Sequence, residues 1–181
     1  NLGAMYLQGR GVPQDYAQAA QWSLKAAEQG DAIAQANLGA MFLQGKGVPQ
    51  DYAQAAQWSL KAAEQGHAAA QVSLASLYIQ GTGVPQDYAE AGKWFRKAAE
   101  QGDRMAQSML GSFYAEGVGV PKDPIEAYMW LTLSVAESTD KQSPFFQQAA
   151  NLRDSLAKSM NSQQIAEAQR LAKEWKQKKA N

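Results

Sequence analysis

The chain has 181 residues, of which 45% are hydrophobic and 19% are charged, and its formal net charge at pH 7 is zero. The charge is uneven, because residues 1–140 hold 9 Lys/Arg and 14 Asp/Glu, a net charge of −5, whereas residues 141–181 hold 8 and 3, a net charge of +5. Nucleic-acid-binding domains are normally basic, so the mildly acidic body argues against nucleic acid as a partner.

The composition also argues against several kinds of site. Without cysteine there is no disulfide framework, thiolate nucleophile or zinc-finger ligand set. His67 is the only histidine, so we expect no metal site and no cofactor. The longest apolar-looking stretch, 127–136, is well short of the ~20 residues that span a membrane, so we predict no membrane insertion. Asn1 lies inside a predicted helix, and we expect that a preceding segment, with any export signal, has been removed.

A unit of 36 residues recurs along the chain. Residues 2–37 and 38–73 differ at six positions only. Near-copies of the segment 44–66 stand at 8–30, 80–102 and 116–138. Self-similarity at such a period is typical of stacked helical repeats. We therefore predict an all-α fold, a right-handed α–α superhelix (solenoid) of antiparallel helix pairs with 36-residue repeats.

Each unit is predicted to fold as helix, turn and helix. In the second unit Gly45 and Gly47 can adopt positive φ, and Pro49 cannot continue a helix. Asp51 is placed to cap the following helix, with Gln54 completing a capping box. The pair recurs as Asp15/Gln18, Asp87/Glu90 and Asp123/Glu126. Such recurrence is typical of helix caps and not of catalytic acids, and we predict no catalytic residue.

The periodicity places the helices as follows. In chain order, they are predicted at 1–9, 16–29, 32–44, 52–65, 68–80, 88–101, 104–116, 124–137, 145–159 and 162–177. Residues 1–138 would form four repeats, the first truncated at its N-terminus, and 139–181 a capping helix pair of the same solenoid. One Trp per second helix is predicted to fill space that the alanines leave. The final lysines, Lys173, Lys176, Lys178 and Lys179, are read as a solvated helix end rather than as a docking patch.

The recurring pattern G-x-G-V-P-x-D-x-x-x-A-x-x-W, followed by K-A-A-E-Q-G and A-Q-x-x-L-G-x-x-Y, resembles the Sel1-like repeat family. This family is a branch of the tetratricopeptide-like α-solenoids. In the second unit the match runs through Gly45, Gly47, Val48, Pro49, Asp51, Ala55 and Trp58. The resemblance implies a non-enzymatic adaptor that holds a protein or peptide on the inner face. Bacterial members are frequently exported or periplasmic, which favours that location while the compartment stays unknown.

Two alternatives to the adaptor stay open. Cysteine-rich relatives are associated with penicillin binding or hydrolysis, but they carry a Cys pair in each repeat and this chain has none. No Ser is placed beside a His or Lys base in a recognisable arrangement. The other alternative is a structural element that self-associates, because an exposed repeat end could stack on another copy.

We predict the partner-binding site on the first helix of each unit. If Leu38 points into the core, a turn of 100° per residue places Ile33, Asn37, Ala40 and Gln44 on a stripe away from it. Amide side chains both donate and accept, so they can pair with a peptide backbone. The other members of the predicted concave groove are Asn1, Ala4, Gln8, Ala69, Ser73, Ser76, Gln80, Met105, Met109, Ser112 and Glu116. The alternative is that these residues are simply solvated helix surface.

Overall fold

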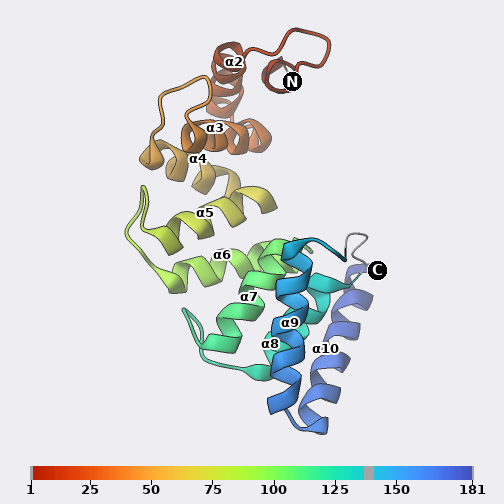
Figure 1. Cartoon of the computed structure of the whole chain (residues 1–181). Coiled ribbons are helices and arrows are strands. Elements are labelled where there is room, and N and C mark those ends of the chain that lie inside the picture. Colours follow the sequence, from red (N-terminus) through yellow and green to blue (C-terminus); the bar gives the residue numbers. More distant parts are fainter. Residues whose placement is uncertain (1, 137–140, 181) are drawn as a thin grey trace. The chain divides into compact units, whose positions relative to one another are not determined.

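The computed structural model describes residues 2–136 and 141–180, which form α-helices and no β-strand (Figure 1). In order, the helices are α1 (Leu2–Gln8), α2 (Tyr16–Glu28), α3 (Ala32–Gln44), α4 (Tyr52–Glu64), α5 (Ala68–Gln80), α6 (Tyr88–Glu100), α7 (Arg104–Glu116), α8 (Pro124–Val135), α9 (Pro144–Ser159) and α10 (Ser162–Ala180). The chain divides into two compact units, 1–98 and 99–181. The all-α prediction is confirmed.

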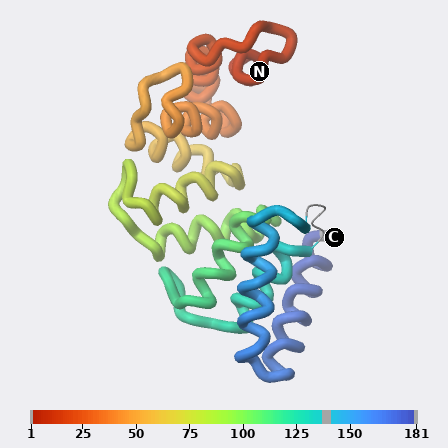
Figure 2. The backbone as a smooth tube through the Cα atoms, viewed as in Figure 1, coloured from red at the N-terminus to blue at the C-terminus, as the bar shows by residue number. Residues whose placement is uncertain are grey.

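The helix bounds differ little from those predicted. Most ends agree within two residues, because the caps and glycines recur in every unit. The last helix, α10, extends to Ala180, three residues beyond its predicted end. Part of the predicted loop, 139–140, and the predicted helix end at 137 lie outside the described residues. Figure 2 follows the backbone from one end of the chain to the other.

The turns at Gly47 and Gly83 pack against the start of the second helix of the preceding repeat. Gly45 and Gly47 have φ values of 65° and 72°, as the pattern predicts. A Cβ atom on Gly47 would lie 2.0 Å from the carbonyl oxygen of Tyr16, so only glycine permits this contact. Gln50 Nε2 donates to the carbonyl of Leu43 at 2.8 Å and ties the turn to the end of α3. The turn therefore positions its own repeat against the preceding repeat.

Aspartate caps the second helix of each repeat, but the predicted capping box is incomplete. Asp51 Oδ1 accepts from the N–H of Gln54 at 3.0 Å. The N–H of Asp51 donates to the carbonyl of Phe42 at 3.0 Å, so the Gln54 side chain does not receive it. The prediction of a reciprocal box is wrong there, because a carbonyl from the preceding helix takes the donor. Both halves of a box do form at Asn161 and Gln164.

Small residues bring the two helices of a repeat close together. A Cβ on Gly39 would lie 2.8 Å from Ser59 Oγ and 3.2 Å from its backbone nitrogen. Trp58 is 9% exposed and packs with Ala27, Ala34 and Leu38. Helices α2 and α4 have the same sequence, YAQAAQWSLKAAE. Trp22 at the equivalent position of α2, however, is 36% exposed.

Buried glutamines link successive repeats, a role that sequence analysis missed. Gln35 and Gln71 are 4% and 2% exposed. Gln35 Nε2 donates to the carbonyl of Ala27, and Gln71 Nε2 to that of Ala63, each at 3.0 Å. Gln107 does the same to Ala99. The recurrence of a glutamine every 36 residues was the sequence signal for this role. Because these amides are buried, each must be hydrogen-bonded. The end of each second helix is thereby joined to the next helix.

Replacing Gln71 by leucine is expected to lower the free energy of unfolding by about 1–3 kcal/mol, because the buried Ala63 carbonyl loses its donor. Denaturant unfolding measures this change. Gln57→Leu, at an exposed position on α4, serves as the control and should stay within about 0.5 kcal/mol of the wild type. Equal losses in the two variants would contradict the structural role of Gln71.

In the second unit, α8 packs against α7, α9 and α10 (Figure 1). Trp130 on α8 is 3% exposed. Its ring meets that of Trp175 on α10 edge-on, with centroids 6.3 Å apart and planes at 71°. Residues 141–180 therefore cover α8 with two helices. That these helices cap the whole solenoid remains a prediction.

Candidate functional site

One face of α3 lines a cavity in the first unit, and three residues predicted to bind a partner lie there. The cavity has a volume of about 260 Å³. Its lining residues are Leu7, Tyr16, Asn37, Ala40, Met41, Gln44 and Lys46. Asn37, Ala40 and Gln44 follow one another at helical spacing along α3. Three of the four residues predicted on the α3 stripe therefore line a hollow in the surface. Their part in partner binding remains a prediction.

The cavity combines an apolar floor with polar groups at its edge. Met41 is 2% exposed and Leu7 is half-buried. Lys46 Nζ lies 5.7 Å from the centre of the Tyr16 ring, within the range of a cation–π contact. Pockets for small organic ligands usually have volumes of about 300–1,000 Å³, so this one suits a single side chain of a peptide better than a drug-sized molecule.

The other predicted residues of the first unit lie outside this cavity. Ile33, at the start of α3, is 58% exposed. On α5, Ser73 Oγ and Ser76 Oγ each donate to a carbonyl of their own helix at 3.0 Å, so toward a partner these hydroxyls act mainly as acceptors. Gln80 accepts a weak hydrogen bond from Thr82 at 3.4 Å. Gln8 and Ala69 are exposed and Ala4 is half-buried, whereas Asn1 lies outside the described residues.

The remaining predicted residues are on α7, in the second unit. Met105 is 54% exposed, an unusual position for a large apolar side chain. Met109 and Ser112 are half-buried and Glu116 is exposed. Their part in partner binding remains a prediction.

The histidine and the aspartates serve as helix caps. His67 Nδ1 accepts from the N–H of Ala70 at 3.3 Å, at the start of α5. Within the described residues, no group of three or more His, Cys, Asp or Glu side chains is placed to hold a metal ion. No helix there combines the length and apolar character needed to cross a membrane.

Surface ion pairs account for the clearest pKa shifts. A hydrogen bond from Arg170 lowers the pKa of Glu167 on α10 below its ordinary value. A hydrogen bond to Glu90 raises the pKa of Lys93 on α6. Neither pair lines the cavity, so these shifts arise from helix-surface contacts and do not point to acid–base chemistry there.

Comparison with known protein families decides the family. The family model of the Sel1 repeat matches residues 1–31, 32–67, 68–103 and 104–137. The chain belongs to the Sel1 repeat family. The resemblance inferred from the glycine–proline turn and its following tryptophan is confirmed, and so is the α-solenoid fold class. Sel1 repeats are generally protein-interaction scaffolds.

Two solved structures of this family are similar to the chain. One is the crystal structure of c5321, a protective antigen present in uropathogenic Escherichia coli strains displaying an SLR fold, with 36% identity and a TM-score of 0.72. The match covers 90% of this chain and only 38% of c5321. The other is a Sel1 repeat protein from Oxalobacter formigenes, with 36% identity and a TM-score of 0.72, covering 88% of this chain and 72% of that one. A search of curated proteins found no match.

Proposed function

We propose that this Sel1 repeat chain is a non-enzymatic scaffold that binds a protein or peptide segment along the first helices of its repeats. The observation that carries the proposal is the cavity of about 260 Å³ on α3. The side-chain amides of Asn37 and Gln44 line this cavity together with apolar residues. Peptide-binding sites use the same combination of polar groups and an apolar surface. Main-chain groups of the ligand pair with the amides, and one apolar side chain enters the cavity.

The repeat extends this face beyond α3. Helix α3 packs beside both α1 and α5. One repeat length after Asn37, Ala40 and Gln44 stand Ser73, Ser76 and Gln80 on α5. The same stripe is therefore present on neighbouring helices of the first unit, with smaller polar groups on α5. A segment longer than one residue could contact both helices.

The double variant Asn37→Ala/Gln44→Ala is expected to weaken partner binding roughly tenfold, because each amide hydrogen bond contributes about 0.5–1.5 kcal/mol. Binding is measured by affinity capture from the cells that produce the protein, with each retained protein quantified by mass spectrometry. The free energy of unfolding should change by no more than about 0.5 kcal/mol per substitution, since neither side chain is fully buried.

The matched control is Gln21→Ala/Gln57→Ala. It also removes two amides, from exposed positions on the second helices α2 and α4. Partner retention by this control should equal that of the wild type. Equal retention by the wild type and the Asn37/Gln44 variant would contradict the proposed face. A substantial loss of stability in that variant would instead show that the amides are structural.

A further inference from the structure

The cavity on α3 carries one charge, that of Lys46, and this charge has no counter-ion among the described residues. Lys46 lies in the turn after α3 and is exposed. Its Nζ stands 5.7 Å from the centre of the Tyr16 ring. Within residues 2–136 and 141–180 the ammonium group forms no hydrogen bond and no ion pair. An ammonium group has three donors, so all three are left for water or a ligand.

No acidic side chain belongs to the described lining of this cavity. Asn1, the one residue of the first unit that the structure does not describe, has an amide side chain and no carboxylate. Asp15, next to Tyr16 in the sequence, caps α2 by accepting from the N–H of Gln18 at 3.0 Å. The positive end of the α2 dipole therefore offsets the charge of Asp15. The charge of Lys46 remains available to a ligand.

The two amides in the same cavity are also unused by the fold. In the described part of the chain, neither the Asn37 nor the Gln44 side chain has a hydrogen bond to the protein. The carbonyls of residues 41–43, at the end of α3, already accept bonds from the turn. The free groups at this end of α3 are therefore mainly donors, and a carboxylate accepts from both ammonium and amide donors.

The next repeat lacks this charge at the equivalent positions. Thr82 replaces Lys46 and Ser73 replaces Asn37, whereas Gln44 recurs as Gln80. The Thr82 hydroxyl donates to Gln80 Oε1 at 3.4 Å, and the Ser73 hydroxyl donates to a carbonyl of its own helix at 3.0 Å. Polar groups on α5 are thus partly used within the chain. Within the first unit, a preference for an acid is therefore expected at α3 and not at α5.

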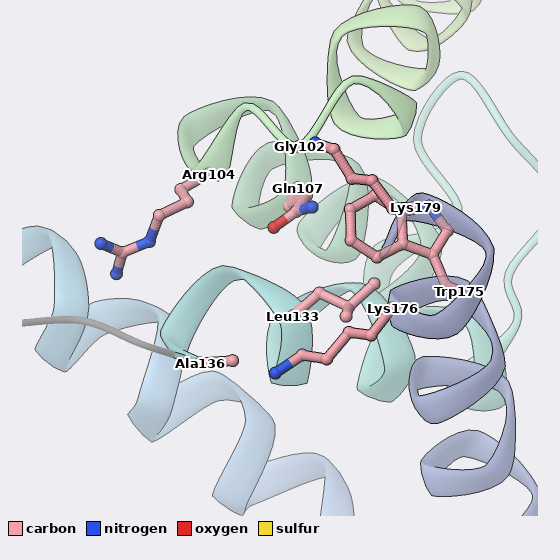
Figure 3. Close-up of a pocket in the computed structure, with 8 residues that line it drawn as sticks. All are labelled: Gly102, Arg104, Gln107, Leu133, Ala136, Trp175, Lys176 and Lys179. Atoms are coloured by element: carbon pink, nitrogen blue, oxygen red, sulfur yellow. The ribbon is translucent and has the colours of Figure 1, made fainter. Parts of the chain in front are cut away.

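The lysines of a larger cavity in the second unit are placed differently (Figure 3). That cavity has a volume of about 590 Å³, and Arg104, Lys176 and Lys179 are among its lining residues. Lys179 Nζ donates to the carbonyl of Gln101, and Lys176 also interacts within the chain. Both lysines there already make contacts within the fold, whereas Lys46 contacts only an aromatic ring.

We propose that the segment bound along the first helices carries an acidic side chain within two residues of the apolar one that enters the α3 cavity, and that Lys46 pairs with its carboxylate. This inference rests on the proposed function, because it names the ligand chemistry of the same groove. Leu7 and Met41 supply the apolar floor, and exposed Lys46 stands at the rim. Side chains two residues apart on an extended segment lie on one face, about 7 Å apart, so they can reach floor and rim together.

The test uses random decapeptides displayed on phage and selected on the full chain. Peptides that bind the wild type but not Asn37→Ala/Gln44→Ala belong to the groove. We expect these peptides to be enriched in Asp or Glu within two residues of an apolar residue. One of them is labelled with fluorescein, and its Kd is measured by fluorescence anisotropy. Lys46→Thr, which introduces the residue found at position 82, should raise this Kd about fivefold, the upper end for an exposed ion pair.

Lys25→Thr is the matched control. Lys25 is also exposed and also lies over an aromatic ring, 4.7 Å from the centre of Trp22, but it does not line the cavity. Its Kd should stay within about twofold of the wild type, since distant exposed charges are screened by salt. Replacing the acid of the peptide by its amide should raise the Kd as Lys46→Thr does. The two changes together should add nothing further, because they remove one interaction.

The possible failures are distinguishable. Groove peptides without an acid, or a Kd that Lys46→Thr leaves unchanged, would overturn this inference while the proposed function stood. The same holds if Lys25→Thr weakens binding equally, or if Lys46→Thr still weakens binding of the amide peptide. If no selected peptide is lost by Asn37→Ala/Gln44→Ala, the inference and the proposed function both fail.

Discussion

Replacing Trp58 by alanine is expected to lower the free energy of unfolding by about 3–5 kcal/mol. The ring is 9% exposed and fills the space among Ala27, Ala34 and Leu38, so its removal leaves a cavity between two repeats. It also removes the cation–π contact with Lys61, whose Nζ lies 4.1 Å from the ring centre. Denaturant unfolding measures the loss.

The control for this variant is Trp22→Ala. Helices α2 and α4 are identical in sequence, so the two substitutions differ only in what surrounds the ring. Trp22 is 36% exposed, and its removal should lower the free energy of unfolding by about 1–2 kcal/mol. In Trp58→Ala, hydrogen exchange should show α3 and α4 opening before α9, because each repeat is stabilised by its neighbours. Uniform loss of protection along the chain would contradict this order.

The Gly47→Ala variant should also be strongly destabilised, by about 2–5 kcal/mol. An L-residue at φ 72° costs about 1–2 kcal/mol. The added Cβ would also lie 2.0 Å from the Tyr16 carbonyl oxygen, and relieving such an overlap typically costs a further ~1–3 kcal/mol. Because the obstacle is backbone, a side-chain rotation cannot remove it. Thermal and denaturant unfolding both measure the change.

Gly66→Ala separates the two causes. Gly66 has φ 88°, but its added Cβ would have no neighbour within 4 Å. Only the cost of the left-handed backbone remains, about 1–2 kcal/mol. If Gly66→Ala and Gly47→Ala lose the same stability, the turn does not press on the start of α2, and the repeat contact described above is wrong.

The sequence determines the helices of this chain more completely than the contacts between them. Four copies of one unit agree on where Asp51 and its equivalents cap a helix and where Gly45 ends one. The capping box failed because the N–H of Asp51 is taken by the Phe42 carbonyl, a partner in the preceding helix. Local pattern predicts which residue caps a helix, but not which distant carbonyl competes for its donor.

The candidate sites also combine residues that a local pattern predicts with residues that only the fold brings together. Helical spacing alone placed Asn37, Ala40 and Gln44 on one stripe, but the cavity beside them also needs Tyr16 from α2. A cavity of about 590 Å³ in the second unit was missed because its lining residues are far apart in sequence. From the sequence, the terminal lysines were interpreted as a solvated helix end. In the folded chain, Lys176 and Arg104 line the same cavity.

Site-specific photo-crosslinking would test the scaffold role most directly. A benzophenone amino acid is placed at Gln44 or Gln80, on the first helices α3 and α5, or at Gln57 on α4, all exposed. The proteins are irradiated in the cells that produce them, and covalent adducts are identified by mass spectrometry. Binding along the first helices predicts one partner protein crosslinked from positions 44 and 80 and not from 57. Adducts from position 57 alone, or none from any position, would contradict it.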